Sequence, residues 1–527
     1  MNFKFCLINF VRFSFRKKKF VALAAIFLLT AIFVAANENE SDKQGTSAES
    51  RQLIKQAEKM TRRGELPEAE KMLRGWLENS PQDSAAKICL SSNLLKQRRV
   101  TEAYDLAYEV ASSESKNSHA FAVLGAILLD AGHFREAENS SVNAVNLDAH
   151  EALGWANLGL LDFYENRIFQ GLNGLRTAVN LSPNEPDFIY SLAQVSARAE
   201  LYNEAANAYN DFLRISPRTD VDRRERIKGL IDFLHFLGSK QKLYEQDGAK
   251  QTVVSFELKN DRPVIKLRIN KTGEPLNFVL DTGAGMSVLS EETAKKLHIK
   301  PVARGGSARG IGGDGKFDVV YGFLKSIYIG DVQIRSVPIF IRKFHQSNEG
   351  TDGYIGLSLI SKFLTTIDYG EKTFELTSKN LADKRPVEKD KLSLPLRLTS
   401  SGFLSGEVEL EGIQSPLNFI VDTGASVSVI SEAVAQTREI SLFVKKDEKM
   451  RVIGAAGVTD SVPLFVLPSI TFGTHRRQNV KAVALDLNLI NESAGFEQSG
   501  ILGGNFLKSY RLTFDFQNSQ VIFDPIK

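Results

Sequence analysis

The chain has 527 residues and 43% hydrophobic composition, which is too much for a single core and is not typical of a disordered protein. Its net charge of +3 depends on segment 1–36, which carries six basic residues and no acidic one, so removing those six charges leaves −3. The body of the chain therefore has no basic excess, and we expect no nucleic-acid partner.

An apolar run at 20–36 follows four consecutive basic residues, Arg16 to Lys19. This order is typical of an export signal, and the small residues Val34 and Ala36 suit a signal peptidase. The run is at the lower limit of length for spanning a bilayer, so segment 1–36 is predicted to be either a signal peptide or a signal anchor. A buried core helix is disfavoured by the basic flank. We expect the body to be exported, periplasmic or otherwise extracytoplasmic, with membrane contact only through residues 20–36.

A polar linker at 37–49 leads into a repeat of 34 residues that fills 50–219. Small residues recur at this spacing, as do residues that end a helix. The recurring positions are Ala69, Ala103, Ala137, Gly171 and Ala205, then Pro81, Ser115, Ala149, Pro183 and Pro217. Small side chains allow close helix packing and proline ends a helix, so the pattern resembles five tetratricopeptide repeats. A capping helix at 223–237 and a linker are expected to complete 220–251. Such an array is either a spacer or a concave groove for a protein partner, and it is expected to fold separately.

Beyond residue 252 the helical period gives way to short alternating runs that are typical of β-strands. Segment 275–284, Pro-Leu-Asn-Phe-Val-Leu-Asp-Thr-Gly-Ala, returns 141 residues later as Pro-Leu-Asn-Phe-Ile-Val-Asp-Thr-Gly-Ala at 416–425. The later Gly-Tyr-Ile-Gly of 353–356 likewise matches Gly-Ile-Leu-Gly of 500–503. Two lobes of similar strand order are therefore predicted at 252–378 and 393–527, with a charged linker at 379–392.

These paired Asp-Thr-Gly-Ala loops resemble the active-site loops of the retropepsin-like aspartic proteases, and the resemblance covers nearly all of both lobes. It implies an all-β bilobal module, after the all-α solenoid, in which each lobe donates one catalytic aspartate, Asp281 and Asp422. It also implies a supporting role for the rest of the two loops. These residues are Thr282, Gly283 and Ala284 in the first loop, and Thr423, Gly424 and Ala425 in the second.

Such a pair hydrolyses peptides with a water held between two carboxyl groups that share one proton. One carboxylate acts as the base and the other carboxyl group protonates the carbonyl oxygen. Two carboxyl groups in contact cannot both ionise, so their apparent pKa values are separated. Aspartic proteases are the standard example of this separation. Glycine after the threonine lets the backbone turn sharply beneath the carboxylates.

A glycine-rich segment lies about thirty residues past each aspartate, and we interpret both segments as flaps that close over substrate. The flap candidates are Gly310, Gly312 and Gly313 in the first lobe, and Gly454 and Gly457 in the second. The first segment also matches G-x-G-x-x-G, but a strand pattern follows where a nucleotide loop needs a helix. The sequence contains no H-E-x-x-H and no C-x-x-C, so neither a metal nor a cofactor is expected.

The leading hypothesis is an exported or membrane-anchored aspartic endopeptidase whose repeats recruit a protein substrate or partner. The alternative is a non-catalytic scaffold, in which the repeats bind a partner and the protease-like lobes are inactive. Both aspartates, both threonines and both glycines are present, which favours the enzyme.

Overall fold

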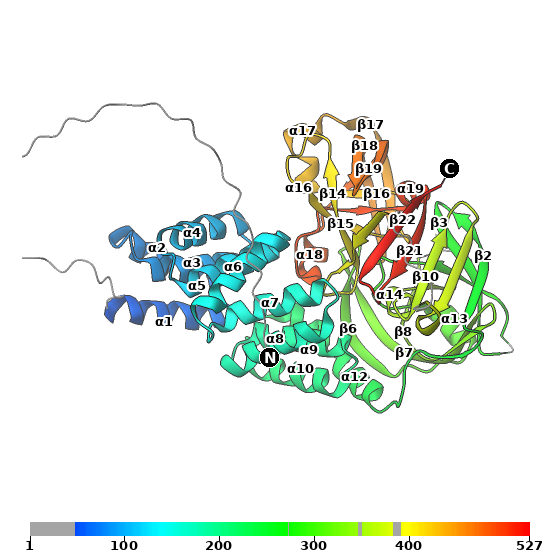
Figure 1. Cartoon of the computed structure of the whole chain (residues 1–527), viewed down its shortest axis with the longest axis horizontal. Coiled ribbons are helices and arrows are strands. Elements are labelled where there is room, and N and C mark those ends of the chain that lie inside the picture. Colours follow the sequence, from blue (N-terminus) through cyan, green and yellow to red (C-terminus); the bar gives the residue numbers. More distant parts are fainter. Residues whose placement is uncertain (1–47, 272, 346–349, 383–391, 527) are drawn as a thin grey trace, which may run out of the picture. The chain divides into compact units, whose positions relative to one another are not determined.

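The computed structural model describes residues 48–526, apart from 272, 346–349 and 383–391 (Figure 1). The predicted export segment 1–36 lies outside the described residues, as does most of the linker at 379–392. Within the described ranges, no helix is both long and apolar enough to cross a membrane. Ala48–Lys527 form one compact unit, in which the helical and β regions share contacts.

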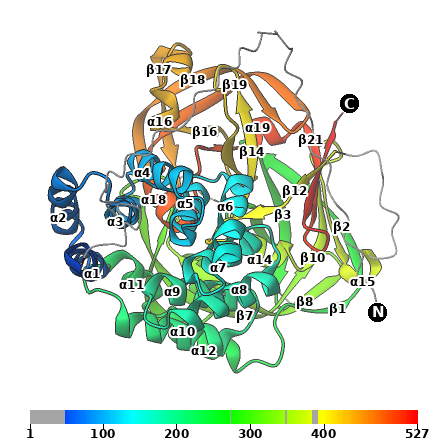
Figure 2. The ribbon, with the colours of Figure 1, turned by 60° about the vertical axis from the view of Figure 1, so that its left-hand side comes forward.

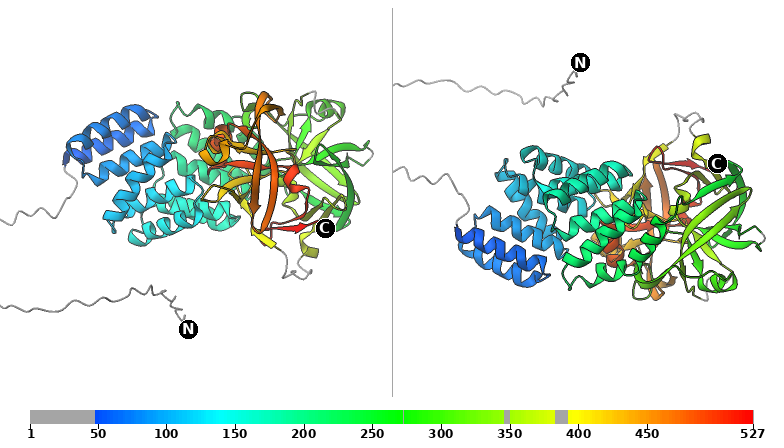
Figure 3. Two further views of the ribbon diagram at one scale, coloured as in Figure 1. Left: turned by 90° about the horizontal axis from the view of Figure 1, so that it is seen from above. Right: turned by 90° about the horizontal axis from the view of Figure 1, so that it is seen from below.

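The first part of this unit is an array of antiparallel helix pairs that lie side by side in chain order (Figure 3). The pairs are α1 (Ala48–Arg62) with α2 (Leu66–Asn79), α3 (Ser84–Lys96) with α4 (Val100–Ser113), α5 (Ser118–Asp130) with α6 (Phe134–Leu147), α7 (Ala152–Tyr164) with α8 (Ile168–Leu181), and α9 (Pro186–Arg198) with α10 (Tyr202–Ile215). Recurrent small residues lie where the helices meet, and a Cβ added to Gly159 would come within 2.9 Å of Gly171 O. The predicted helical repeat array is therefore confirmed.

Each pair turns through one residue of left-handed backbone conformation. These residues recur every 34 positions as Gly64, Arg98, Gly132, Asn166 and Glu200. The second and fifth are long side chains that adopt this conformation at some cost, so the turn is set by helix packing and not by glycine alone. The left-handed turn therefore recurs at a fixed position of the repeat, although the residue type at that position varies.

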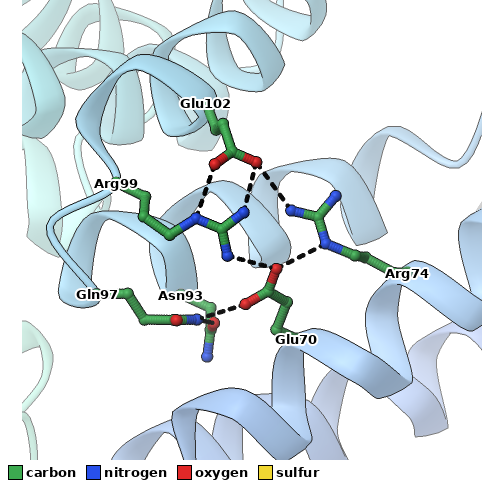
Figure 4. A network of polar contacts seen from close by, with 6 residues as sticks. All are labelled: Glu70, Arg74, Asn93, Gln97, Arg99 and Glu102. Atoms are coloured by element: carbon green, nitrogen blue, oxygen red, sulfur yellow. Dashed lines mark hydrogen bonds and ion pairs between the residues drawn. The ribbon is translucent and has the colours of Figure 1, made fainter.

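Neighbouring repeats are joined by a polar network in which Glu70 on α2 is the central acceptor (Figure 4). Its carboxylate accepts hydrogen bonds from Arg74, Gln97 and Arg99 at 2.7, 2.9 and 2.7 Å. Burial alone would raise the pKa of Glu70, but these donors outweigh it and lower the pKa to about 2. Glu102 on α4 accepts from the same two arginines, so α2 and α4 are held by shared guanidinium groups.

The predicted capping helix is broken into α11 (Val221–Ile227) and α12 (Leu230–Gly238). The break is at Gly229, whose φ of +76° takes the chain out of the helix. A Cβ at this glycine would lie 2.0 Å from the carbonyl oxygen of Gly305 in the first lobe. The single predicted helix is therefore wrong, because close backbone contact with the lobe requires a sharp turn there.

The first lobe is built from β1 (Glu245–Gly248), β2 (Gln251–Lys259), β3 (Arg262–Ile269), β4 (Leu276–Leu280), β5 (Val288–Ser290), β6 (Ala303–Arg309), β7 (Lys316–Ile329), β8 (Val332–Arg342), β9 (Gly353–Ile355), β10 (Phe363–Asp368) and β11 (Thr373–Ser378). Its short helices are α13 (Glu291–Lys296), α14 (Leu357–Ile360) and α15 (Lys379–Ala382).

The second lobe repeats this order with β12 (Leu392–Pro395), β13 (Arg397–Leu398), β14 (Leu404–Leu410), β15 (Leu417–Val421), β16 (Ser428–Ser431), β17 (Val444–Ile453), β18 (Val458–Phe472), β19 (His475–Leu485), β20 (Gly500–Leu502), β21 (Tyr510–Asp515) and β22 (Gln520–Pro525). Its helices are α16 (Glu432–Ala435), α17 (Arg438–Ser441), α18 (Asn488–Ala494) and α19 (Gly504–Leu507). The region is mainly β-sheet, which confirms the predicted fold class (Figure 2).

The two lobes are joined by a shared antiparallel sheet in the order β12-β22-β21-β10-β11-β2. Its centre is the pairing of β10 with β21, where Thr366 lies opposite Thr513 and their hydroxyl groups are 3.2 Å apart. Because each lobe contributes strands to this sheet, the lobes cannot separate without breaking a continuous ladder. The shared sheet holds the two Asp-Thr-Gly loops at a fixed mutual position.

Contacts between the array and the lobes are also extensive. Phe496 of the second lobe is fully buried in the core of the array, against Phe134 and Tyr164. Conversely, Phe233 and Leu237 of α12 belong to the core of the lobes. The sequence-based expectation of a separable array does not account for this sharing of cores.

Candidate active site

Two buried strands carry the predicted aspartates to the junction of the lobes. Asp281 follows β4 and Asp422 follows β15. The backbone N–H of Asp281 donates to Ile355 O at 3.0 Å, and that of Asp422 donates to Leu502 O at 3.0 Å. These acceptors lie in β9 and β20, which run parallel to β4 and β15. The matched Gly-x-x-Gly segments of the sequence therefore fix where each aspartate leaves its strand.

Thr282 and Thr423 bind the two loops to each other through four reciprocal hydrogen bonds. The N–H of each threonine donates to the hydroxyl oxygen of the other at 3.1 Å. Thr282 Oγ1 donates to Val421 O at 2.6 Å, and Thr423 Oγ1 donates to Leu280 O at 2.7 Å. Both side chains are fully buried, so each hydroxyl group is satisfied as donor and acceptor. The predicted bracing role of the threonines matches this geometry.

Each glycine of the motif packs beneath the aspartate of the opposite lobe. A Cβ added to Gly283 would lie 2.3 Å from Asp422 Cγ, and a Cβ added to Gly424 would lie 2.5 Å from Asp281 Cγ. No other residue type fits there without displacing a carboxyl group. The glycines are required by the close approach of the two lobes as well as by the turn.

The two carboxyl groups are hydrogen-bonded to each other but have different surroundings. Asp422 Oδ1 accepts from the backbone N–H groups of Gly424 at 2.7 Å and Ala425 at 3.1 Å. Asp281 Oδ1 is buried and has no hydrogen-bond partner within the described part of the chain. The donors thus favour negative charge on Asp422.

Burial and the adjacent Asp422 charge raise the pKa of Asp281 well above its usual range. The hydrogen bond to Asp422 adds to this effect, because Asp281 is its donor. Burial also raises the pKa of Asp422, but the N–H of Gly424 and the proton held by Asp281 oppose the increase. The two carboxyl groups therefore titrate as one coupled unit, in which the donors to Asp422 favour the anionic form of that residue.

The predicted flaps are two hairpins whose tips contact each other. The first flap is β6 and β7 with the turn 310–315, and the second is β17 and β18 with the turn 454–457. The N–H of Ala456 donates to Ile311 O at 2.9 Å, and a Cβ on Gly312 would lie 2.2 Å from Gly457 O. The candidates Gly310, Gly312, Gly313, Gly454 and Gly457 all lie at this tip-to-tip contact. In the nucleotide-like match, β7 and not a helix follows the glycines.

Arg342, at the end of β8, is a residue of the site that sequence reasoning missed. It donates a hydrogen bond to Ala455 O in the second flap, and its guanidinium lies 4.9 Å from the centroid of the Phe317 ring in the first. Its charge acts to lower the pKa of Asp281, although burial dominates that group. No motif marks this arginine, because Ala455 lies 113 positions away and Phe317 lies on a different strand.

Buried apolar clusters include residues of the strands that carry the two aspartates. On the second lobe, Ile420, Val429 and Ile501 form a cluster that also contacts Ile311 at the first flap tip. On the first lobe, Val279 and Val288 pack with Tyr354. Within the described residues, no group of His, Cys, Asp and Glu could hold a metal ion. The arrangement brings two buried carboxyl groups together at the junction of the lobes, and each lobe also contributes one of two contacting flaps.

The family model described as "Aspartyl protease" matches residues 265–359 and 406–506, one segment in each lobe. Each segment contains one of the two aspartates and the flap of its lobe.

Individual proteins also match parts of the chain. A Drosophila melanogaster protein described as "BBSome complex member BBS4 homolog" is 29% identical over 135 residues. The match covers 25% of this chain and 28% of that relative. A TPR protein of Thermus thermophilus superposes with a TM-score of 0.30 and 19% identity, covering 35% of this chain and 98% of that one. For PilF of Pseudomonas aeruginosa the TM-score is 0.28 at 18% identity, covering 36% of this chain and 85% of that one. The aspartyl protease model thus matches the C-terminal region twice, once in each lobe, and both matches follow the array of helical repeats.

Proposed function

We propose that this protein is an aspartic endopeptidase that hydrolyses peptide bonds with a water activated between Asp281 and Asp422. The observation that carries the proposal is the hydrogen-bonded pair of carboxyl groups whose surroundings favour one shared proton. Two acidic side chains in contact repel each other when both are ionised, and this repulsion costs stability. A purely structural role therefore does not explain the pair. Such an arrangement supports acid–base chemistry on a neutral, polarised substrate.

The roles follow from the asymmetry of the pair. The Asp422 carboxylate accepts a proton from the water, whose oxygen attacks the carbonyl carbon of the peptide. Asp281 donates its proton to the carbonyl oxygen, which gives a neutral tetrahedral diol. When the diol collapses, the C–N bond breaks and the leaving nitrogen takes the proton from Asp422, while a diol proton returns to Asp281. The dyad is thus regenerated without any covalent intermediate.

The substrate class we propose is a peptide or protein bound in extended form beneath the flaps. The repeats would recruit a protein substrate or partner, as helical solenoids present extended concave surfaces. We further propose that residues 20–36 direct export and then are removed or remain as an anchor, so that the enzyme acts outside the cytoplasm.

The test is hydrolysis of a mixed peptide library by the full chain, with cleavage sites read by mass spectrometry. Wild type should cleave, while Asp281→Asn and Asp422→Asn should not. Asp247→Asn removes a half-exposed, ion-paired carboxylate on β1 and is the matched control. A statine-type mimic of the diol should inhibit and a chelator should have no effect. Absence of cleavage by wild type, with a partner bound to the repeats, would favour the scaffold alternative.

A further inference from the structure

Just below its tip, the first flap is bound by a carboxylate from the helical array. Asp222, on α11, accepts hydrogen bonds from Arg309 Nη2 at 2.8 Å and from Lys316 Nζ at 2.8 Å. Arg309 is the last residue of β6, Lys316 is the first of β7, and the two are register partners. One side chain of the array therefore bridges both strands of the flap at the base of its turn.

The grip is strengthened by the burial of Arg309, whose side chain is only 1% exposed. A buried guanidinium is strongly destabilising without its anionic partners. Besides Asp222 it has Glu492 of α18 at 3.6 Å and the hydroxyl group of Ser307 at 3.2 Å. The position of the flap strand is thus tied to one carboxylate from the array and one from the second lobe.

The backbones of the array cap and the first flap also meet. A Cβ on Gly306 would lie 2.8 Å from Lys228 O. The register of β6 with β7 shifts between Arg304 and Ser307, at the position where the α11–α12 turn approaches. A bulge in the flap strand therefore accommodates the turn between the two cap helices.

On the side of α11 that faces the array, Arg223 donates to Asp187 of α9 at 2.7 Å. Asp187 is in turn paired with Lys96 of α3, and the Arg223 guanidinium lies 5.0 Å from the centroid of the Phe212 ring. The short helix α11 is therefore fixed to the repeats by Arg223 and to the flap by Asp222. A displacement of α11 relative to the repeats would move the flap base with it.

The second flap has no such support. Among the described residues, no hydrogen bond or ion pair joins β17 or β18 to the helices of the array, and the cross-strand pair Arg451 and Asp460 is exposed to solvent. The two flaps are alike in sequence pattern and different in mechanical attachment.

We propose that Asp222 is a positioning residue of the protease, through which the helical array holds the first flap in the closed position over the dyad. This inference rests on the proposed function, since a flap position matters to hydrolysis only if the dyad is active. It makes the array a component of active-site closure and not only a recruiting module. Loss of the Asp222 carboxylate loosens the base of the first flap, and it reaches the second flap only through the contact between the tips.

The experiment compares full-chain wild type, Asp222→Asn, Asp222→Glu and the control Asp247→Asn on a peptide too short to reach the repeats. Hydrogen exchange of segments 303–329 and 444–472 is measured on the same samples. Asp222→Asn should lower kcat/KM by about 10-fold to 100-fold, since misplacement of a closing element has that effect. It should also speed exchange in 303–329 more than in 444–472. Asp222→Glu should restore most of both, and Asp247→Asn should match wild type.

Unchanged exchange in 303–329 and unchanged kcat/KM in Asp222→Asn would overturn the inference. Faster exchange with no hydrolysis by wild type would support flap positioning and refute the protease, so the two failures are distinguishable. If Asp222→Asn does not fold, Lys316→Met removes the half-exposed partner instead and should speed exchange in 303–329 to a smaller extent. No change in that variant's exchange would count against the proposal.

Discussion

Asp422 receives two backbone hydrogen bonds that Asp281 Oδ1 lacks, although the two carboxyl groups occupy pseudo-equivalent positions in their lobes. The difference comes from the loops, because Gly424 N and Ala425 N point at Asp422 Oδ1 at 2.7 and 3.1 Å. The N–H of Gly283 also acts to lower the pKa of Asp281, but burial and the Asp422 charge outweigh it and favour the neutral form. In the proposed mechanism this asymmetry makes Asp281 the acid and Asp422 the base.

The first prediction concerns removal of either half of the pair. Asp281→Asn and Asp422→Asn should each lower kcat by about 10²–10⁴-fold or more, because a general acid or base usually contributes that much to the rate. Near-wild-type turnover by either folded variant would contradict the assignment. Circular dichroism and thermal midpoints at one pH serve as the folding control.

The second prediction is that Asp281→Asn changes stability in a pH-dependent direction. Because burial raises the pKa of Asp281, its contribution to stability is complete below the pKa of the unfolded chain and is lost as pH rises through the folded pKa. An amide stays neutral throughout, so the variant should gain stability relative to wild type as pH rises from about 4 toward 7. Thermal midpoints measured across this range check the trend. A difference that is constant or falls with pH would mean that Asp281 is not the protonated partner.

The third prediction tests the contact between each glycine and the opposite aspartate. Gly283→Ala places a methyl group 2.3 Å from Asp422 Cγ, so either the loop or the carboxyl group must move. Overpacking of this kind costs about 1–3 kcal/mol, and we expect loss of hydrolysis in a protein that still folds. Gly75→Ala on α2 is the control, since a Cβ there meets nothing within 4 Å and the helix should become more stable. Retained activity in Gly283→Ala would contradict the close approach of the lobes.

Much of the site could be predicted from the sequence because its chemistry is local. Asp281, Thr282 and Gly283 are consecutive, and the second copy of the motif shows that the first is not accidental. The role of each threonine depends on the other loop, yet the duplicated sequence predicts a reciprocal arrangement. The helices of the array can also be predicted from the sequence, because small residues mark their spacing of 34 residues along the chain.

The remaining features depend on contacts between distant segments, for which no local pattern exists. Asp222 meets Arg309 across 87 positions, and Arg342 meets Ala455 across 113. Gly229 interrupts a helical pattern, but the carbonyl groups of Arg304 and Gly305 explain why the helix must break there. Likewise, Phe496 has the character of a lobe core residue and is instead buried in the array. Side-chain type predicts burial in these cases but not the partner.

The fourth prediction concerns the charge of Arg342 beside the dyad. Removing a cation near a carboxyl group favours the neutral acid, so Arg342→Met should raise the pKa of Asp281 and move the upper limb of the kcat/KM profile to higher pH. Arg342→Lys keeps the charge while changing the hydrogen bond to Ala455 O, so its limb should stay close to that of wild type. A loss of rate with an unmoved limb in Arg342→Met would show that the arginine serves only to hold the second flap.

The last prediction concerns the alanines that follow the two glycines. Pepsin-like enzymes usually carry a hydroxyl residue there, whereas Ala284 and Ala425 supply none. The N–H of Ala425 already donates to Asp422 Oδ1 at 3.1 Å, so a hydroxyl group on the same residue is close enough to reach that carboxyl group. A donor to the charged form lowers a pKa, and its absence leaves the singly protonated pair present at weakly acidic to neutral pH. Ala284→Ser with Ala425→Ser should therefore move both limbs of the kcat/KM profile to lower pH, whereas Ala284→Gly with Ala425→Gly adds no donor and should not. A profile that stays in place or rises in the active serine variant would show that another group sets the working pH.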